Sequence, residues 1–397
     1  MGRGKISREV VITGVGAVTA LGSGVDAFWQ GLLSGRPGVG PVSLFDPSRY
    51  QCRVAAEVAL VPEDPRGETQ DRAHRLALAA AAEALASCPS FGGPRAAIVA
   101  GTTLGGNRLF TDWLAARAGS NSGLPAQSSL GSAARILALR FGARGPVQTV
   151  SVACASGTAA IGAGLELIRR GEADRVLAGG YDALSEFVFS GFDCLRALTR
   201  GTPRPFDRRR DGLALGEGAA FVLLEERGAA FRRGVEALAI VRGYASASDS
   251  LHMTRPSPDG AGLVRAIEGA FFDAAVPPSS VGFISSHGTA TQFNDRMEAA
   301  AFRTVFGEIL GAVLVNSIKG AVGHTLGAAG ALEAVMSALA LSRGVVPPTL
   351  HHEETDPACG LDIVAGTSRR LPPEARIALS TSSAFAGTNA ALVLENA

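Results

Sequence analysis

The sequence predicts an α/β fold in which buried strands alternate with alanine-rich helices. Short runs of β-branched and other apolar residues recur along the chain, and stretches rich in alanine and leucine separate them, as in proteins whose strands are covered on both faces. Many of the fifty glycines directly follow these runs, which indicates tight turns from strand to helix. The expected strands are, in order, Val10–Thr13, Ala97–Ala100, Gln148–Val152, Val176–Ala178, Phe283–Ser285 and Val313–Asn316.

Two of the expected helices, within 154–171 and 324–344, resemble each other in sequence. Each follows a strand, opens with a run of small residues and ends in Arg-Gly. Small residues on one face let a helix approach a neighbouring helix or sheet closely. The pair therefore predicts a duplicated fold with two helices stacked at its centre, and two unrelated alanine-rich helices remain the alternative.

A charged stretch gives way to a new strand between Glu236 and Val241. We place a boundary there and expect two domains, residues 1–238 and residues 239–397. With 397 residues, 47% of them hydrophobic, the chain is long enough for two domain-sized halves with a large core.

Charge and cysteine content exclude several classes of function. Lys and Arg (37) balance Asp and Glu (36), so no field of one sign draws the chain to nucleic acid or to an anionic membrane. The five cysteines form no C-x-x-C pair, which favours free thiols in a reducing compartment over disulfides or a zinc site. Residues 1–9 contain no apolar targeting segment, and Gly330 and Glu333 interrupt the apolar stretch 328–341. We expect a cytoplasmic protein without a membrane span.

Cys154 is the first candidate for chemistry. It lies where the expected strand Gln148–Val152 gives way to a helix that begins at Ala155 or Ser156. Free backbone N–H groups and the helix dipole at such a position favour a thiolate. A cysteine among alanines is, however, more often a small buried apolar residue, so the assignment depends on the rest of the chain.

Two loops that follow expected strands, 286–298 and 316–324, are dense in polar side chains. Open α/β sheets hold their ligands at the ends of strands, and both loops and Cys154 fall at comparable positions. For Asp295, capping of the helix that begins near it is the simpler interpretation. The candidate site residues are His287, Thr289, Thr291 and Glu298 in the first loop and Lys319 and His324 in the second.

The order of these motifs resembles that of the elongating β-ketoacyl-acyl carrier protein synthases, and the resemblance covers nearly the whole chain. It implies a thiolase-like, duplicated α-β-α-β-α layered fold with two mixed sheets around central helices. The shared blocks are Cys-Ala-Ser-Gly at 154–157, His-Gly-Thr-x-Thr at 287–291, Lys-x-x-x-x-His at 319–324 and Phe-x-Gly-Thr-Asn at 385–389, with supporting blocks at 11–16 and 204–219.

The resemblance implies a decarboxylative condensation. Cys154 would take an acyl group as a thioester, and the carbanion formed from malonyl-acyl carrier protein would attack it. His287 and His324, as neutral imidazoles, would stabilise the enolate as carbon dioxide leaves. Lys319 and Glu298 would set the orientation and charge of the two histidines. A surface charge for Lys319 and a helix-face carboxylate for Glu298 remain the alternatives.

Substrate delivery and partners also follow from the resemblance. The family's oxyanion hole consists of the backbone N–H groups of Cys154 and Phe385, and Phe385 would gate the acyl pocket. Thr289 and Thr291 match hydroxyls that hold a pantetheine arm. The acyl carrier protein supplies this phosphopantetheine arm, so neither a metal nor a diffusible cofactor is implied. The expected second subunit, joined through an edge strand, is either another copy of this chain or a protein like the chain-length factors.

The chain departs from the family pattern at three places. Ala384 and Ala386 flank Phe385 where glycines are usual, which predicts a stiffer gate or a different order of acyl loading. Gln-Phe-Asn at 292–294 replaces the usual Pro, small residue and Gly, and the stretch Ala118–Ala134 lacks the bulky residues of a fatty-acyl tunnel. Fatty-acid elongation and a secondary pathway to a polyketide or polyene therefore both stay open.

Two other functions suit the same fold. A degradative thiolase should carry a second cysteine in a C-terminal Cys-x-Gly loop, where this chain has Phe385-Ala-Gly-Thr-Asn. A non-catalytic subunit like the chain-length factors usually lacks the nucleophile, whereas this chain keeps Cys154, both histidines and Lys319. The condensing enzyme is the favoured interpretation, with the non-catalytic or partner-dependent subunit as the alternative.

Some motifs predict no site. Gly14 and Gly16 follow a strand, but Thr19 stands where a dinucleotide-binding motif needs its last glycine. The run Arg208–Arg210 is interpreted as a solvated turn or as a contact for the acidic carrier protein. We expect solvated or loop positions for the histidines outside the motifs, which are His74, His252, His351 and His352.

Overall fold

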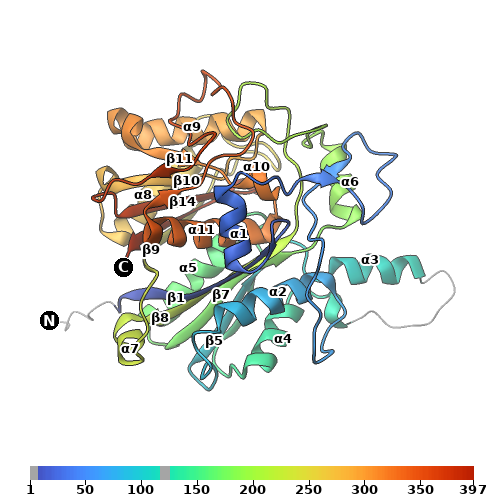
Figure 1. Cartoon of the computed structure of the whole chain (residues 1–397), viewed down its shortest axis with the longest axis vertical. Helices are drawn as coiled ribbons and strands as arrows, with labels where there is room; N and C mark the ends of the chain where they lie inside the picture. The colour runs from blue at the N-terminus through green and yellow to red at the C-terminus, as the bar shows by residue number, and fades with distance from the viewer. Residues whose placement is uncertain (1–7, 117–125) are drawn as a thin grey trace.

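Ten strands follow one hydrogen-bonded path through the molecule (Figure 1). The computed structural model describes residues 8–116 and 126–397. Strands in the first half of the path are β1 (Val10–Thr19), β8 (Gly218–Glu226), β7 (Arg175–Asp182), β5 (Ala96–Gly101) and β6 (Val147–Val150). Those in the second half are β9 (Ala239–Ser248), β15 (Thr388–Asn396), β14 (Ile377–Ser383), β10 (Val281–Ser285) and β11 (Leu314–Asn316).

The two halves of the path have the same topology. The orders β1-β8-β7-β5-β6 and β9-β15-β14-β10-β11 both run through two antiparallel pairings and then two parallel ones. They join edge to edge where 10–12 of β1 pairs with 239–241 of β9. The expected duplication into two mixed sheets is thus confirmed. The division at residues 238 and 239, directly before β9, stays a prediction, because hydrogen bonds connect the two half-sheets.

Two central helices, α5 (Ser156–Arg169) and α11 (Ala329–Arg343), lie between the half-sheets and contact strands of both (Figure 1). A Cβ atom on Gly157 would lie 2.8 Å from the backbone nitrogen of Ala331 and from the carbonyl oxygen of Gly327. The helices therefore approach so closely that glycine is required at this crossing, as the small-residue pattern predicts.

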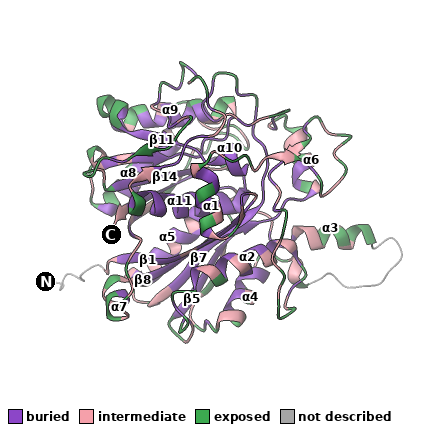
Figure 2. Cartoon of the chain, viewed as in Figure 1, coloured by how far each residue is buried: buried purple, intermediate pink, exposed green. Residues whose placement is uncertain are grey.

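The apolar segment Leu326–Arg343 is long enough, by length and composition, to cross a membrane, but 89% of it is buried inside the protein. It is the core of the molecule, and Figure 2 shows the central helices largely as buried residues.

Outer helices complete five layers, α-β-α-β-α. Helices α2 (Arg72–Ala84) and α4 (Ser132–Phe141) cover the first half-sheet, while α8 (Ala261–Ala274), with α9 (Gln292–Phe306) packed on it, covers the second. Smaller helices are α1 (Val25–Leu33), α3 (Asn107–Ala116), α6 (Glu186–Cys194), α7 (Arg227–Arg232) and α10 (Lys319–Val322). Short strands are β2 (Gly22–Ser23), β3 (Gly40–Pro41), β4 (Val54–Ala55), β12 (Val345–Val346) and β13 (Arg369–Arg370).

The two ends of the strand path differ. Residues 362–364 cover the outer side of β11, since Val315 donates to Asp362 O and accepts from Val364 N. At the other end, β6 pairs only with β5 among the described strands, and its residue Val147 is exposed. The edge of β6 is therefore open for pairing with another chain.

The close helix crossing predicts the outcome of a substitution. Gly157→Ala should lower the free energy of unfolding by about 2 kcal/mol, because its methyl group meets the backbone of α11. Gly191→Ala is the matched control, since Gly191 lies in α6 with open space at its Cβ position, and it should gain about 0.5–1 kcal/mol of helix stability. Chemical denaturation measures the free energy of unfolding of both variants, and equal changes in the two would contradict the close approach of α5 and α11.

Candidate active site

Cys154 lies at the entrance to helix α5. Strand β6 ends at Val150, two residues before the predicted end, and the chain then bends through Ala153, whose φ is 50°. This conformation is unfavourable for a residue with a Cβ, and it turns the buried Cys154 toward His324. The distance from Cys154 Sγ to His324 Nε2 is 3.1 Å.

Two effects oppose each other at the Cys154 thiol. Burial raises the pKa of its thiol to about 12, although the Lys319 charge acts in the opposite direction. Burial therefore opposes the thiolate that the start of α5 favours, and His324 Nε2 lies within reach of the thiol proton. Burial, and next the Lys319 charge, lower the pKa of His324 well below 6.5, which leaves a neutral imidazole able to accept that proton.

The two histidines face each other across the site. His287 follows β10 and His324 follows α10, and their ring centroids are 5.1 Å apart with an interplanar angle of 86°. Burial, then Lys319 and His324, lower the pKa of His287 well below 6.5. Lys319 Nζ lies 3.2 Å from His287 Nδ1. Because an ammonium group only donates, Nδ1 accepts and the proton of this neutral ring is on Nε2.

Lys319 is held by Glu333, a residue that the sequence analysis did not assign to the site. Lys319 Nζ donates to Glu333 Oε1, and both side chains are buried. Burial raises the pKa of Glu333 to about 7, while Lys319 acts to lower it. The available signal was the single carboxylate of the largely apolar helix α11, since such a charge is retained in a core only with a partner.

Glu298 contacts the backbone of the histidine loop and not an imidazole ring. Its Oε1 accepts from His287 N and its Oε2 from Gly288 N, each at 2.7 Å. Asn294 Nδ2 and Thr381 Oγ1 donate to the same carboxylate, at 2.9 and 3.1 Å. Burial, and then the Asp295 charge, raise its pKa to about 7. Glu298 therefore fixes the loop that places His287.

Thr289 and Thr291 lie side by side at the start of α9, with their Oγ1 atoms 3.0 Å apart. Thr291 is the N-cap of this helix, since its Oγ1 accepts from Asn294 N. The capping role expected for Asp295 is thus wrong, because Thr291 is the N-cap and Asp295 lies within the first turn of the helix. Its buried Oδ2 instead accepts from Phe206 N at 2.7 Å.

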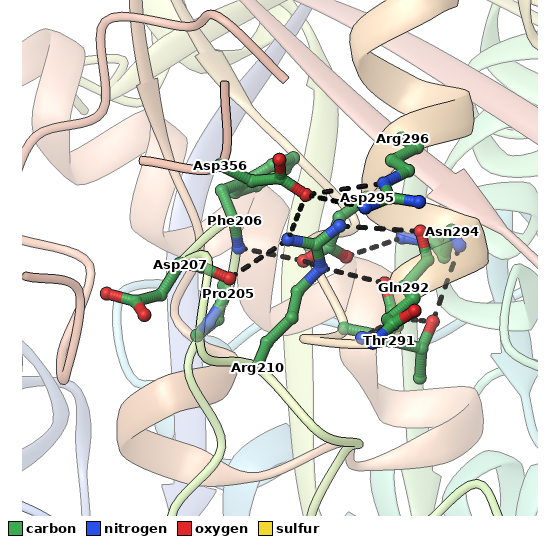
Figure 3. A network of polar contacts seen from close by, with 12 residues as sticks. Pro205, Phe206, Asp207, Arg210, Thr291, Gln292, Asn294, Asp295, Arg296 and Asp356 are labelled. Atoms are coloured by element: carbon green, nitrogen blue, oxygen red, sulfur yellow. Dashed lines mark hydrogen bonds and ion pairs between the residues drawn. The ribbon is translucent and has the colours of Figure 1, made fainter. Parts of the chain in front are cut away.

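A buried arginine connects this loop to two other segments. Figure 3 shows the Arg210 guanidinium between Asp356 and the start of α9. It donates to Asp356 Oδ2 at 2.8 Å, to Asp207 O at 2.9 Å and to Thr291 O at 3.3 Å, and it faces Asp295 Oδ2 at 3.5 Å. Arg210 thereby fixes the carbonyl side of the threonine pair.

We expected the arginine run 208–210 to be a solvated turn or a contact for the carrier protein, but its three side chains have different surroundings. Arg210 is buried, whereas Arg208 and Arg209 are exposed and ion-paired with Glu354 and Glu353, at 2.6 and 2.5 Å. The exposed charges of the run are therefore already matched.

One cavity of about 490 Å³ connects the candidate residues. Both threonines, Phe385, Cys154, His287 and His324 line it, whereas Lys319, Glu298 and Glu333 lie behind its wall. Of the tunnel stretch Ala118–Ala134, residues 118–125 lie outside the described residues, and the described remainder does not line this cavity.

Phe385 lies in a short 3-10 turn at the cavity wall, stacked on Phe192 of α6 with centroids 5.3 Å apart. Of the two alanines that flank it, Ala384 is extended (φ −121°), a conformation open to any residue. Ala386 has φ 63°, which favours glycine, and its N–H donates to Met253 O at 2.6 Å. The strain at this gate is therefore located at Ala386.

Of the remaining histidines, His252, His351 and His352 lie in loops as expected, and only His74 differs from the expectation. His74 is fully buried in α2 and contacts Thr69 Oγ1 and Ser132 Oγ, at 3.2 and 2.9 Å. His352 is buried against Pro205 O. His252 is exposed but lines the cavity, which its sequence surroundings did not indicate.

Models of two protein families match the chain. The "Beta-ketoacyl synthase, N-terminal domain" matches residues 7–230 and the "Beta-ketoacyl synthase, C-terminal domain" matches residues 238–353. Together they span more than half of the sequence.

Characterised relatives are similar over almost their whole length. The tetracenomycin polyketide synthase ketoacyl synthase alpha subunit of Streptomyces glaucescens is 40% identical, over 98% of this chain and 97% of that protein. The 3-oxoacyl-[acyl-carrier-protein] synthase 2 of Synechocystis is 34% identical, over 98% of both.

Two solved structures show the same fold. The ishigamide ketosynthase/chain length factor has a TM-score of 0.91 at 36% identity, over 98% of this chain and 100% of that one. AntDE:AntF, a type II polyketide synthase acyl-carrier protein in complex with its ketosynthase, has a TM-score of 0.89 at 30% identity, with the same coverage.

The strained gate residue leads to a stability prediction. Ala386→Gly should raise the free energy of unfolding by about 1 kcal/mol, because glycine adopts a φ of 63° without a Cβ clash. Ala384→Gly, at an extended position, should instead cost about 0.5–1 kcal/mol of chain entropy. Denaturation of both variants tests this, and destabilisation by Ala386→Gly would contradict it.

Proposed function

This chain belongs to the β-ketoacyl synthase family, and from that premise we propose that Cys154, His287 and His324 catalyse decarboxylative condensation of an acyl group with malonyl-acyl carrier protein. The product is a β-ketoacyl-acyl carrier protein. The observation that carries the assignment is a buried thiol and two neutral imidazoles on one cavity, with Cys154 Sγ 3.1 Å from His324 Nε2.

The first half-reaction is transfer of the acyl group to Cys154. Its Sγ attacks the thioester carbonyl of the acyl-carrier protein, and the bond from that carbonyl to the pantetheine sulfur breaks. Because the thiol is protonated when buried, His324 Nε2 accepts its proton and returns it to the departing pantetheine thiol. We infer that the backbone N–H groups of Cys154 and Phe385 bind the transient oxyanion.

The second half-reaction needs neutral hydrogen-bond donors. As carbon dioxide leaves the malonyl thioester, negative charge develops on its carbonyl oxygen, and the two imidazoles stabilise the enolate through their Nε2–H groups. For His324 this step requires that the ring proton has moved from Nδ1 to Nε2 after the first half-reaction. Lys319 contributes through His287, since it occupies Nδ1 and leaves the proton on Nε2. The enolate carbon then attacks the acyl carbon on Cys154, the C–S bond breaks, and the released Cys154 thiolate takes up a proton from water, which regenerates the thiol.

Delivery of both substrates is assigned to an acyl carrier protein. We propose that its phosphopantetheine arm enters the cavity along Thr289 and Thr291 and that the reaction needs no separate cofactor. In the described ranges 8–116 and 126–397, no group of three or more His, Cys, Asp or Glu residues could hold a metal ion. All five cysteines are free, which supports the cytoplasm as the compartment.

The open edge of β6 supports association with a second subunit. Similar proteins include a ketosynthase paired with a chain length factor and a 3-oxoacyl synthase 2, so polyketide and fatty-acid pathways both have relatives here. We propose a dimer through β6, formed either with a second copy or with a chain-length-factor-like subunit. Because this chain keeps Cys154 and both histidines, it is the catalytic subunit of the heterodimer, and in the homodimer both copies are catalytic.

Condensation by the purified protein tests the function. Malonyl-carrier protein is incubated with a panel of acyl-carrier proteins, and products are identified by mass spectrometry. Wild type should form β-ketoacyl-carrier protein, Cys154→Ala should form none, and Cys194→Ala should match wild type because Cys194 does not line the cavity. The preferred acyl group distinguishes the two pathways. Undiminished product from Cys154→Ala would overturn the assignment.

Lys319 should control the pH dependence of decarboxylation. Its charge lowers the pKa of both histidines, so Lys319→Met should raise these pKa values, and the neutral rings are then lost earlier as the pH falls. The rate should drop about 10- to 100-fold, and the acid limb of the profile should move to higher pH.

The double variant Lys319→Met/Glu333→Gln is the control for folding, because it removes both buried charges together. Its free energy of unfolding should be close to that of wild type, and the acid limb of its pH profile should still lie at higher pH. An acid limb that stays in place in both variants would contradict the role of Lys319.

A further inference from the structure

A buried carboxylate at the end of strand β7 has no role in the chemistry assigned above. Asp182 is the last residue of β7, and none of its surface is exposed. Its Oδ1 accepts from Thr102 Oγ1 at 2.6 Å and from Leu104 N at 2.9 Å. Its Oδ2 accepts from Thr103 N at 2.8 Å and from Gly327 N at 2.7 Å. The four bonds fix β7, the loop after β5 and the turn at Gly327 relative to one another.

The turn at Gly327 directly follows the site histidine His324. Leu326 in this turn is buried and has a φ of 54°, a left-handed conformation that costs about 1–3 kcal/mol for a residue with a Cβ. A Cβ on Gly327 would lie 2.7 Å from Asp182 Oδ2, so glycine is needed for the turn to approach the carboxylate this closely. The bond from Gly327 N to Asp182 therefore holds a strained turn in place.

The position of the His324 ring depends on its backbone. Among the described residues, its buried Nδ1 has no hydrogen-bond partner, so no side chain orients the ring from behind, opposite Cys154. On one side of the ring, His324 N donates to Ala214 O at 2.7 Å. On the other side, the first bond to a side chain is the one from Gly327 N to Asp182. Loss of this bond would let the ring move.

The same carboxylate is connected to the turn that holds the nucleophile. Ser156 opens α5 two residues after Cys154, and its Oγ donates to Ala153 O at 2.6 Å. This Oγ also lies 3.3 Å from Thr102 O. Because Thr102 Oγ1 donates to Asp182, the carboxylate is linked to the turn around the thiol as well as to the turn after the histidine.

We propose that Asp182 is a positioning residue that sets the distance between the Cys154 thiol and the His324 ring, a role that rests on the condensing function proposed above. Asp182 does not line the cavity, so it acts through the two turns and not on the substrate. Its bonds keep Sγ and Nε2 at 3.1 Å while the thiol proton moves. A displacement of about 1 Å between reacting groups can cost roughly a hundredfold in rate.

Asparagine at this position cannot satisfy all four donors. Each carboxylate oxygen accepts from at least one backbone N–H group, Oδ1 from Leu104 and Oδ2 from Thr103 and Gly327. In either orientation, the amide NH2 of an asparagine therefore meets a backbone N–H, and both groups only donate. Asp182→Asn keeps the shape of the side chain and breaks its connection to at least one of the turns.

The rate at which Cys154 is acylated tests this role. Wild type and Asp182→Asn are incubated with the acyl-carrier protein that wild type prefers, and intact-protein mass spectrometry gives the rate against donor concentration. Asp182→Asn should lower the maximal rate about 10- to 100-fold and change KM by less than about twofold, because the donor still binds while proton transfer to His324 slows. A loss confined to KM would overturn the proposal.

Glu225→Gln is the matched control, because it removes a second buried carboxylate of the same sheet. Glu225 lies on β8 opposite Arg175, at the other end of β7 from Asp182. Its partners Thr13, Arg175 and Arg233 do not line the cavity. Glu225→Gln should lower the free energy of unfolding, as Asp182→Asn does, yet be acylated at about the wild-type rate. Equal losses of rate in the two variants would show a general effect of destabilisation and overturn the proposal.

A milder substitution keeps the test valid if Asp182→Asn does not fold. Thr102→Val removes the hydroxyl that donates to Asp182 at nearly constant size, and Thr102→Ser keeps it. Thr102→Val should slow acylation about three- to tenfold, and Thr102→Ser should react at about the wild-type rate. Equal rates in these two variants would overturn the proposal.

Nitrogen NMR reports the position of the ring without any turnover. In 15N-histidine-labelled protein, the Nε2 signal of His324 should move in Asp182→Asn toward that of a ring nitrogen without a hydrogen bond, because the thiol is no longer within reach. It should stay in place in Glu225→Gln. An unchanged signal in folded Asp182→Asn would contradict the positioning role.

The outcomes separate this inference from the proposed function. Acylation of wild type together with an unchanged rate in folded Asp182→Asn would overturn the positioning role and leave the condensing function intact. No acylation of Cys154 in wild type by any acyl-carrier protein would overturn the function and the positioning role together.

Discussion

The buried ion pair between Lys319 and Glu333 is the interaction on which the rest of the site depends. It joins α10 to the central helix α11, and the same ammonium group contacts His287 Nδ1. Burial is the larger cause that lowers the pKa of both histidines, and the Lys319 charge lowers it further; at the Cys154 thiol the same charge opposes the rise in pKa that burial causes. A single buried charge would be costly, and the pair with Glu333 makes the ammonium tolerable in the core. Apart from Lys5, Lys319 is the chain's only lysine, and a compact ammonium fits where a guanidinium fork would not.

The Lys319–Glu333 ion pair acts on Cys154 only because the two central helices, α5 and α11, are in contact. Gly157 lets α5 approach α11 at van der Waals distance, which brings Cys154, at the start of α5, to the side of the molecule where the loop before α11 holds His324. The duplicated topology explains the convergence, because α5 and α11 occupy equivalent places in the two halves. Two buried side chains fix the loop that contains His287 and Thr291. Glu298 accepts from His287 N, and Arg210 donates to Thr291 O.

Much of this could be predicted from the sequence, because it depends on local pattern. Six of the ten strands of the path, the small-residue helices and the clustering of Cys154 with both histidines follow from periodicity and motif order, whereas β8, β14 and β15 were not among the expected strands. Glu333 and Asp295 could not be placed, since their partners belong to other segments of the fold, Lys319 of α10 for Glu333 and Arg210 with Phe206 for Asp295. The environment of the Cys154 thiol could not be predicted either, because burial raises its pKa and burial is a property of the packed molecule.

The protonation of the two site histidines at neutral pH tests the central claim most directly. Nitrogen NMR of 15N-histidine-labelled protein reports the tautomer of each ring, and variants His287→Gln and His324→Gln assign the two signals. Both rings should be neutral at pH 7, and His287 should carry its proton on Nε2 because Lys319 occupies Nδ1. A charged imidazolium at either position, or a proton on Nδ1 of His287, would contradict the account.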